Sequence, residues 1–499
     1  MCGSKVRSLT LLAAVGAILA LAAPTASAHS PRFFVGAAKA DITPTSLEGL
    51  YLGGYGIGPS HLAKGVLRPI YARAIAIRDR SGHQVVIAAL DLQGHFLAYQ
   101  QGAYGFADIA SDIERRLGIP ASHLLLQSTH THNGPDDLGV WGGVPDSYLA
   151  RVKAQTEAAI VDAVRSERPA DLVWGTADMK GFAGTFGSDT DATHTGDQAD
   201  YPLDNQLRVL QARSPRGQVL ATLVNFSTHP TVYGPLDKVS PDWPGATATY
   251  LEDAERNIAP RTRYGYPGSV AVVTVGAVGH SWPAGTPRGT DPSVDPSPKS
   301  DNGPADDYGN AVARMAMAAV ARHPQPVAGD GVAGAETDLD VTNTNAALLG
   351  LLVAPVPGYH IDRSLMPPYG AGDVLITRAL ALRVGDLAFF SSPGEAYPSI
   401  HTALATQVHA PVAFVMSLAD DQLGYVEQLA DYNGAAQCSL GDEWFFTISP
   451  TFGAQLLAAQ RANARALGFV APVPPPPGDL DPGPVPPSTN CTAQQVPQG

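Results

Sequence analysis

Cysteine is scarce in this chain of 499 residues, which contains only Cys2, Cys438 and Cys491. Cys2 lies in an N-terminal segment that we expect to be removed, so the processed protein has room for one disulfide. In an oxidising compartment two remaining cysteines suggest such a bridge, although the sequence alone does not prove it. A disulfide between Cys438 and Cys491 would tie the C-terminal tail to the body of the protein.

Long apolar runs are also absent, with one exception at the N-terminus. Two basic residues precede the apolar run 9–23, and residues 26–28 (Ala-Ser-Ala) have the small side chains of a cleavage site. This order is typical of a signal peptide, and the run is too short for a persuasive membrane span. We therefore predict cleavage after Ala28 and a secreted protein, extracellular or periplasmic, without stable insertion in a membrane.

Positively charged residues are fewer than negatively charged ones. The chain has 32 Lys and Arg and 46 Asp and Glu, which gives a formal net charge of −14. Residues 1–28 carry two basic and no acidic residues, so their removal leaves a formal charge of −16. This balance argues against binding nucleic acid or anionic lipid through a basic surface. With 44% hydrophobic and 16% charged residues, the chain has ample material for a large core.

Apolar, β-branched runs alternate with helical patterns along residues 29–470. This alternation predicts the α/β class, as a large mixed domain with packed β-sheets flanked by helices. The expected strands are 32–42, 71–78, 84–92, 124–128, 206–212, 218–227, 270–276, 376–392 (a hairpin turning near 385) and 411–418. The expected helices are 107–117, 146–165 with Asp146 as N-cap, 244–257, 308–322 and 452–467.

Three segments lack this apolar periodicity. Residues 181–205 and 281–309 are rich in Gly, Asp, Thr and Pro, and loops of that length are often lids or substrate walls, with disordered insertions as the alternative. Residues 471–499 contain 10 prolines in 29 positions, which predicts an extended tail and not a packed domain. The predicted organisation is a signal peptide (1–28), one domain (29–470) and a proline-rich tail (471–499).

A pair of histidines follows the apolar run 124–126, within Thr-His-Thr-His-Asn-Gly-Pro at 129–135. Residues two apart on an extended chain point the same way, so His130 and His132 can face one cleft. Neutral imidazole is a favoured zinc ligand. Alone, the pair is weak evidence, because hydrogen-bonded histidines at a polar strand end would give the same pattern.

Three further polar groups also come just after apolar runs. They are His229 in Phe-Ser-Thr-His-Pro, Glu395 in Pro-Gly-Glu and Tyr425 in Gly-Tyr. Each has a plain structural alternative, namely a core histidine, a turn glutamate or a buried tyrosine. Their shared position beyond a strand is where α/β proteins assemble their sites, which favours one common site.

The four motifs, together with Ala-Asp-Ile-Thr-Pro at 40–44 and Gly-Gly-Tyr-Gly at 53–56, resemble those of the neutral (non-lysosomal) ceramidase family and occur in its order. The resemblance implies the fold of that family's N-terminal catalytic domain. It also implies a zinc ion (Zn²⁺) held by four ligands and three candidates for catalytic roles. The implied ligands are His130, His229, Glu395 and Tyr425, and the implied catalytic residues are His132, Tyr425 and, as an alternative proton donor, Tyr432.

The chain departs from the family pattern around the substrate. Val272 stands near the place of a serine considered catalytically important, loop 186–191 replaces an arginine-containing segment, and Gln437 stands where a tyrosine is expected. The family's C-terminal immunoglobulin-like domain is not expected either, because only the proline-rich tail follows residue 467. The metal site is thus retained while the groups that recognise the family's substrate are changed.

We therefore expect a secreted zinc-dependent hydrolase that cleaves an N-acyl amide, ceramide or a related compound, by attack of zinc-bound water. His132 would protonate the leaving amine, and Asp242 would either hold a histidine or cap a helix. The two polar loops suggest small N-acyl amides or esters as better substrates than ceramide. The alternatives are a zinc-dependent esterase, a non-catalytic binding protein with a retained zinc site, and a serine hydrolase using Ser281 in Gly-His-Ser-Trp-Pro.

Overall fold

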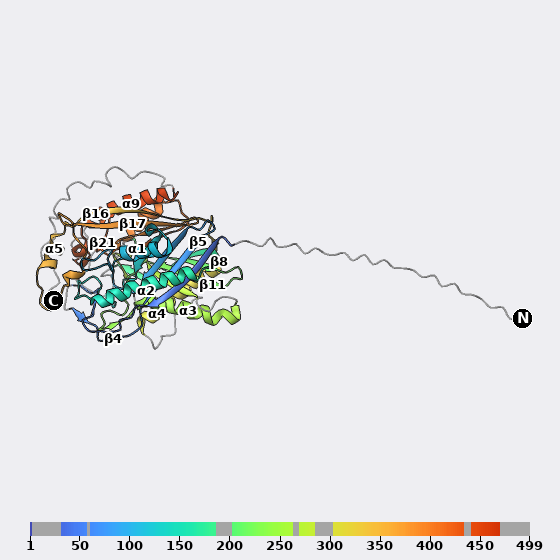
Figure 1. The fold of residues 1–499 in the computed structure, drawn as a ribbon, viewed down its shortest axis with the longest axis horizontal. Helices are drawn as coiled ribbons and strands as arrows, with labels where there is room; N and C mark the ends of the chain where they lie inside the picture. The colour runs from blue at the N-terminus through green and yellow to red at the C-terminus, as the bar shows by residue number, and fades with distance from the viewer. Residues whose placement is uncertain are drawn as a thin grey trace.

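The structure is a computed structural model that describes residue 1 and residues 31–56, 60–185, 202–262, 269–284, 303–433 and 441–469. Figure 1 shows how these residues are arranged. The signal peptide, the Cys438–Cys491 disulfide, the proline-rich tail and most of the two polar loops were predicted for residues outside these ranges. Those expectations stay predictions.

A nine-stranded sheet has the order β13-β11-β10-β8-β1-β5-β6-β7, and the short β15 also pairs with β8. Its strands are β1 (Phe33–Asp41), β5 (Tyr71–Asp79), β6 (Gln84–Leu90), β7 (Leu124–Ser128), β8 (Arg168–Asp178), β10 (Gln206–Arg213), β11 (Val219–Phe226), β13 (Val270–Val275) and β15 (Gln325–Pro326). β6 and β7 pair in parallel, as do β11 and β13. All residues of β7 and β13 are buried, which explains why both are nearly continuous apolar runs.

The two end strands of this sheet come together. The Gln127 side chain on β7 donates to the backbone oxygen of Val275 on β13 (2.7 Å) and accepts from its backbone N–H (3.2 Å). β13 also contacts β5 and β6. Because the sheet curls in this way, the segments that follow β7 and β11 reach the same end of the molecule.

A second, four-stranded sheet packs against the first. Its order is β16-β17-β18-β20, formed by β16 (Val332–Thr342), β17 (Val374–Val384), β18 (Leu387–Ser391) and β20 (Ala413–Met416). One core cluster joins Ile75 and Leu125 of the first sheet to Phe389 and Phe414 of the second, whose rings stack with centroids 4.5 Å apart. Each fully buried phenylalanine stabilises the fold by about 1.5–3 kcal/mol.

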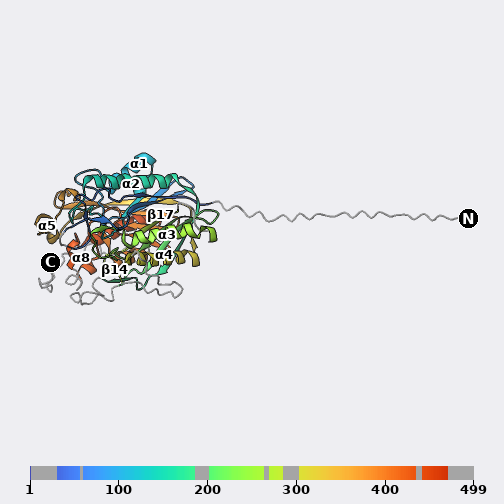
Figure 2. The same cartoon turned by 90° about the horizontal axis from the view of Figure 1, so that it is seen from below.

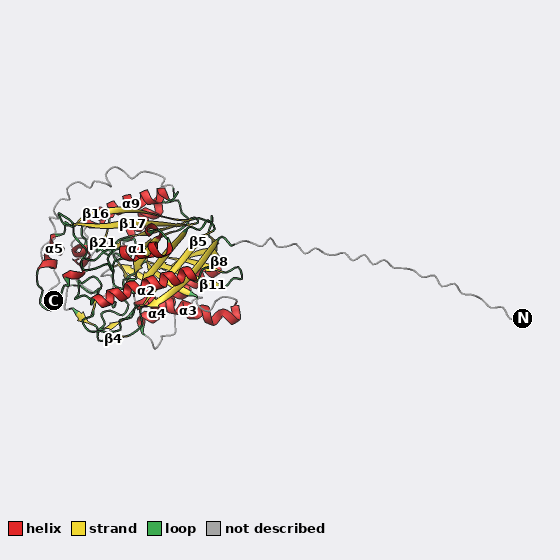
Figure 3. Cartoon of the chain, viewed as in Figure 1, coloured by secondary structure: helices red, strands yellow, loops and turns green. Residues whose placement is uncertain are grey.

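Helices cover the outer faces of the two sheets. They are α1 (Phe106–Leu117), α2 (Asp146–Arg165), α3 (Asp242–Thr262), α4 (Pro304–Arg322), α5 (Ala346–Val353), α6 (Pro398–Gln407), α7 (Leu429–Asn433), α8 (Gly441–Phe446) and α9 (Phe452–Ala466). Figure 2 shows α1 and α2 on one side of the strands and α3 and α4 on the other, and α9 lies against β16 and β17. Figure 3 shows the short helix α5 at the end of the molecule remote from α3.

Short strand pairs complete the described structure. They are β2 (Tyr51–Leu52) with β3 (His61–Leu62), β4 (Gly65–Val66) with β12 (Lys238–Val239), β9 (Ala183–Thr185) with β14 (Ser281–Pro283), and β19 (Glu395–Ala396) with β21 (Tyr425–Val426). None of the helices in the described ranges is both long and apolar enough to cross a lipid bilayer.

The predicted mixed α/β class is confirmed, and each expected strand and helix is present with ends that differ by up to five residues. The prediction missed the strands β8 and β16 and the helices α5 and α6, besides the shortest elements. The prediction of Asp146 as N-cap was wrong. Pro145 is the N-cap in an extended conformation, and Asp146 is the first helical residue, where a carboxylate favours the helix dipole.

Candidate metal centre

The four predicted metal ligands follow or belong to strands that end at one place. His130 comes two residues after β7, and His229 comes three residues after β11. Glu395 and Tyr425 are directly paired in the parallel strands β19 and β21. Residues paired in this way are neighbours on the same face, so the two side chains lie close together. The structure therefore brings His130, His229, Glu395 and Tyr425 together beyond the strand ends, and their role as metal ligands stays a prediction.

The backbone around this location is held in an uncommon conformation. His130 has a φ of 66°, and Leu418 and Asp420, which follow β20, have φ values of 51° and 67°. Non-glycine residues rarely adopt this left-handed conformation, and such positions cluster at functional sites. Two backbone hydrogen bonds join the segment that ends β7 to the segment that follows β20. The N–H of Ser128 donates to the oxygen of Leu418 (3.1 Å), and the N–H of Asp420 donates to the oxygen of Leu126 (2.7 Å).

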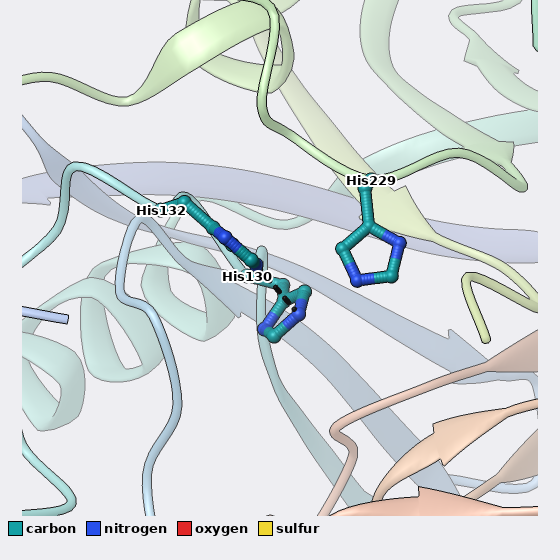
Figure 4. A group of neighbouring side chains, drawn as sticks. All are labelled: His130, His132 and His229. Atoms are coloured by element: carbon teal, nitrogen blue, oxygen red, sulfur yellow. Dashed lines mark hydrogen bonds between the residues drawn. The ribbon is translucent and has the colours of Figure 1, made fainter. Parts of the chain in front are cut away.

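Three buried histidines and one glutamate converge here. One ring nitrogen each of His130, His132 and His229 lies within 4.8 Å of the others, and Figure 4 shows the three rings gathered at this point. Nε2 of His132 is 3.1 Å from Nε2 of His130. Oε2 of Glu395 lies 3.1 Å from Nε2 of His229 and 3.4 Å from Nε2 of His130. Imidazole nitrogens and a carboxylate oxygen are the donor set that zinc accepts.

Two of the histidines are oriented by backbone carbonyl groups. Nδ1 of His130 lies 2.8 Å from the oxygen of Gln93, and Nδ1 of His229 lies 3.0 Å from the oxygen of Ser281. Because a carbonyl only accepts, Nδ1 carries the proton and the lone pair of Nε2 points into the centre. This is the arrangement of metal-binding histidines, so these residues fit a metal ion.

His132 differs from the other two histidines. Its Nδ1 is buried and has no hydrogen-bond partner among the described residues. Its ring packs edge-on against Tyr55 at 5.1 Å, and a Cβ on Gly54 would lie 2.5 Å from the ring, so glycine is required there. Packing therefore places the His132 ring, and no backbone carbonyl holds a proton on its Nδ1. A histidine without such a contact is suited to exchange a proton.

The electrostatics of the centre favour a neutral His132 beside an ionised Glu395. Burial lowers the pKa of His132 well below its usual value, and the neighbouring His130 and His229 lower it further. Burial alone would raise the pKa of Glu395, but His130 and His229 lower it well below its usual range. Gln422 adds a hydrogen bond from Nε2 to Oε1 of Glu395 (3.0 Å).

Trp282 on β14 covers one side of the centre. Its ring stacks on His229 with centroids 4.3 Å apart and planes inclined by 4°. The Trp243 indole donates to the backbone oxygen of His229 (3.2 Å). His229 is therefore fixed at its ring, its Nδ1 and its backbone.

A cavity of about 320 Å³ opens beside these residues, within the size range of small-molecule sites. His130, His132, Glu395 and Tyr425 all line it. Most of its other lining residues are apolar. They come from α5, α8, the start of β17 and the connecting segments: Phe96, Leu138, Trp141, Leu348, Leu351, Leu352, Met366, Leu375, Phe446 and Ile448. The centre thus faces a mainly apolar cavity.

Other predicted residues have different surroundings. Tyr432 lies on α7, where its hydroxyl shares a hydrogen bond with Trp444, and it is not among the described residues that line the cavity. Its catalytic role stays a prediction. Asp242 accepts hydrogen bonds from the backbone N–H groups of Val232, Tyr233 and Trp243. Trp243 lies at the start of α3, whereas Val232 and Tyr233 belong to the segment after His229, so Asp242 joins that segment to the helix.

Ser281 does not have the surroundings of a nucleophile. Its hydroxyl donates to the backbone oxygen of Ser227 (2.7 Å), and its backbone oxygen accepts from His229. The segment that follows is the short strand β14, whereas a nucleophile elbow joins a strand to a helix. The serine-hydrolase alternative therefore finds no support in this geometry.

The sequence prediction missed Trp282, Gln422 and Glu443 as parts of the site. Gln422 lies three residues before Tyr425, and Trp282 follows Ser281, so closeness to the quoted motifs could have identified both. Glu443 lines the cavity from α8, and we find no signal in the sequence that distinguishes it from other acidic residues.

Comparisons with known proteins agree with this architecture. The sequence pattern described as "Neutral/alkaline non-lysosomal ceramidase, N-terminal" matches residues 33–287, just over half of the chain. No curated protein sequence matches this chain. The solved structure of neutral ceramidase from Pseudomonas aeruginosa has a TM-score of 0.65 at 18% identity, with 89% of this chain and 77% of that chain covered.

A ceramidase structure complexed with C2 gives a TM-score of 0.66 at 17% identity, with the same coverage. At these identities the structural likeness shows the fold, while the sequence match over residues 33–287 shows the family. The chain belongs to the neutral/alkaline non-lysosomal ceramidase family.

Proposed function

We propose that this protein is a zinc-dependent hydrolase that cleaves the amide bond of an N-acyl compound with an apolar acyl chain. The observation that carries the proposal is the pair of buried histidines, His130 and His229, whose Nδ1 atoms are held by backbone carbonyls while their Nε2 atoms face Glu395. Such a set of buried lone pairs beside a mainly apolar cavity is unfavourable without a cation.

His130, His229, Glu395 and Tyr425 are the ligands that we propose for zinc. Bound zinc would lower the pKa of a water molecule and polarise the acyl carbonyl group. The three histidines alone form a competing ligand set, because their nitrogens lie within 4.8 Å of one another. We favour the first set because His132 lacks the carbonyl contact at Nδ1 that orients the other two histidines.

His132 is the residue that we propose for proton transfer. It lines the cavity and its pKa is lowered by burial, so its neutral ring can accept a proton and then donate it to the leaving amine nitrogen. Glu395 remains ionised beside it and stabilises the imidazolium form. Hydrolysis of the amide then yields a carboxylic acid and an amine.

The apolar lining supports an aliphatic acyl chain in the cavity. Leu348, Leu351 and Ile448 offer no polar group to a substrate, and burying each CH₂ group is worth about 0.8 kcal/mol. One of the matched ceramidase structures is a complex with C2. This apolar lining does not favour the small polar substrates that the loops 181–205 and 281–309 suggest. Most residues of those two loops lie outside the described ranges.

The test is the hydrolysis of a series of N-acyl amides and matched esters, from acetyl to hexadecanoyl, by the zinc-loaded protein. We expect amide cleavage that rises with acyl length, stops when a chelator removes the metal, and returns with zinc. Absence of metal-dependent cleavage across the whole series would refute the proposal, and cleavage of the esters alone would favour an esterase.

A further inference from the structure

Glu443 on α8 is a second carboxylate in the cavity. Among the described residues that line the cavity, only Glu395 and Glu443 carry a carboxyl group. Glu395 belongs to the candidate metal centre. Glu443 is 1% exposed and lies in a wall that is otherwise mainly apolar, with Phe446 one helical turn away on the same helix. Burial of a carboxylate in such a wall is unfavourable unless hydrogen-bond donors reach it.

Two side chains from the neighbourhood of the metal centre hold Glu443 in place. The Tyr397 hydroxyl donates to Oε2 (2.6 Å), and Nδ1 of His280 lies 3.1 Å from Oε2 and 3.3 Å from Oε1. His280 directly precedes Ser281, and Tyr397 comes two residues after Glu395. The carboxylate is thus fixed relative to the centre by the same two segments that position His229 and Glu395.

These contacts leave hydrogen-bonding capacity on the Glu443 carboxylate. A carboxylate has about four acceptor positions, and the described side chains supply two donors, both closest to Oε2. Oε1 receives only the longer His280 contact. A ligand that enters the cavity with a hydroxyl or N–H group can therefore donate to an oxygen that the described side chains leave with spare acceptor capacity.

We propose that Glu443 accepts a hydrogen bond from a hydroxyl or N–H group on the amine half of the substrate and so determines which amides are cleaved. This inference rests on the proposed amide hydrolysis. The acyl chain has no donor and fits the apolar lining, so the donor belongs to the other half of the molecule. Glu443 lies on the Tyr425 side of the cavity, since Tyr397 contacts both residues.

The test compares two amides that differ in one group. N-dodecanoyl-2-aminoethanol carries a hydroxyl where N-dodecanoylpropylamine carries a methyl group of similar size. For the zinc-loaded wild type we expect kcat/KM to be about ten- to a hundredfold higher for the hydroxyl compound, the range of a hydrogen bond to a charged group. In Glu443→Gln we expect this preference to fall to threefold or less.

Glu427→Gln is the matched control. Glu427 is also buried and its Oε1 accepts from Thr447, but it is not among the described lining residues, so its replacement should keep the preference of the wild type. Glu443→Asp retains the charge but withdraws the carboxylate by one methylene. It should keep its zinc and lose part of the preference, which provides a second variant should the glutamine variant unfold.

The two possible failures are distinguishable. If the wild type cleaves neither amide, the proposed hydrolysis itself fails. If it cleaves both equally, or if Glu443→Gln and Glu443→Asp keep the full preference with normal zinc content, the role of Glu443 is overturned while amide hydrolysis stands. Equal losses for both amides in the Glu443 variants would also overturn it, because they would indicate a purely structural carboxylate.

Discussion

The cavity has two ends that are built in different ways. At the polar end, His130, His229 and Glu395 come from segments that directly follow strands of the two sheets, and hydrogen bonds to backbone atoms fix both histidines. At the apolar end, Leu348, Leu351 and Phe446 come from the short helices α5 and α8, and none of these three side chains is charged. The first end is rigid and suited to chemistry, and the second is suited to selection among substrates.

This difference predicts where changes are severe. A substitution at the polar end should abolish the reaction, whereas one at the apolar end should alter which substrate is preferred. The following variants test that division, from the largest expected effect to the smallest.

The largest effect is expected for His229→Ala, which should lose zinc and activity together. Replacement even of a residue that only orients a metal ligand weakens metal binding or activity by about 10–100-fold, so loss of a ligand should exceed a hundredfold. Elemental analysis and amide hydrolysis measure the two losses. His323→Ala, at an exposed position after α4, is the control and should keep both. Full zinc occupancy in His229→Ala would remove His229 from the ligand set.

His132→Ala should separate metal binding from turnover. We expect zinc content to stay near that of the wild type, because the proposed ligands remain, while kcat falls by about a hundredfold or more, the contribution of a placed acid or base. The same two measurements apply. An empty metal site in this variant would identify His132 as a ligand and support the three-histidine set.

Leu351→Asn should affect substrate choice at the apolar end. Burial of a leucine side chain is worth about 1.5–3 kcal/mol, so kcat/KM for a dodecanoyl amide should fall about tenfold or more, with a much smaller change for the acetyl amide. Leu349→Asn is the matched control, since Leu349 lies on the same helix outside the cavity lining. Equal losses for both chain lengths would contradict the assignment of this end to the acyl chain.

The smallest effect concerns Asp136, in the loop that leads to the cavity residue Trp141. Burial raises the pKa of Asp136 from 3.8 to about 7. Between about pH 4 and 7, Asp136 therefore keeps its proton in the folded protein and loses it in the unfolded chain. The free energy of unfolding falls as pH rises through that window because the unfolded state binds fewer protons. The slope is at most about 1.4 kcal/mol per pH unit.

Asp136→Asn cannot titrate, so it should lose less stability than the wild type between pH 5 and pH 8, as measured by urea unfolding. Parallel pH profiles in the two proteins would show that Asp136 is ionised in the folded state.

The polar end could be predicted from the sequence because its residues lie next to strong local signals. The apolar runs before His130 and His229 are fully buried strands, and buried strands are nearly continuous runs of apolar residues. Glu395 and Tyr425 likewise follow β18 and β20. Their convergence could not be derived from any single run, because it depends on the curl that Gln127 closes between β7 and β13.

The apolar end was missed for physical reasons. α5 has eight residues, all apolar or glycine, so it shows no periodicity that distinguishes a helix from a buried strand. In β16 only Val332, Leu339 and Val341 are buried, and three side chains are acidic, so its apolar pattern is weak. β8 carries a proline at its second position, which lowers strand propensity. The role of Glu443 depends on contacts with Tyr397 and His280, which are far from it in the sequence.

A crystal structure of the zinc-loaded protein, with anomalous scattering measured at the zinc edge, tests the proposed zinc site most directly. We predict one zinc ion bound by Nε2 of His130, Nε2 of His229 and a Glu395 oxygen at about 2.0–2.2 Å and by the Tyr425 hydroxyl group, with His132 outside bonding distance. Zinc bound elsewhere, or an empty site between these three residues in fully loaded protein, would contradict the central claim.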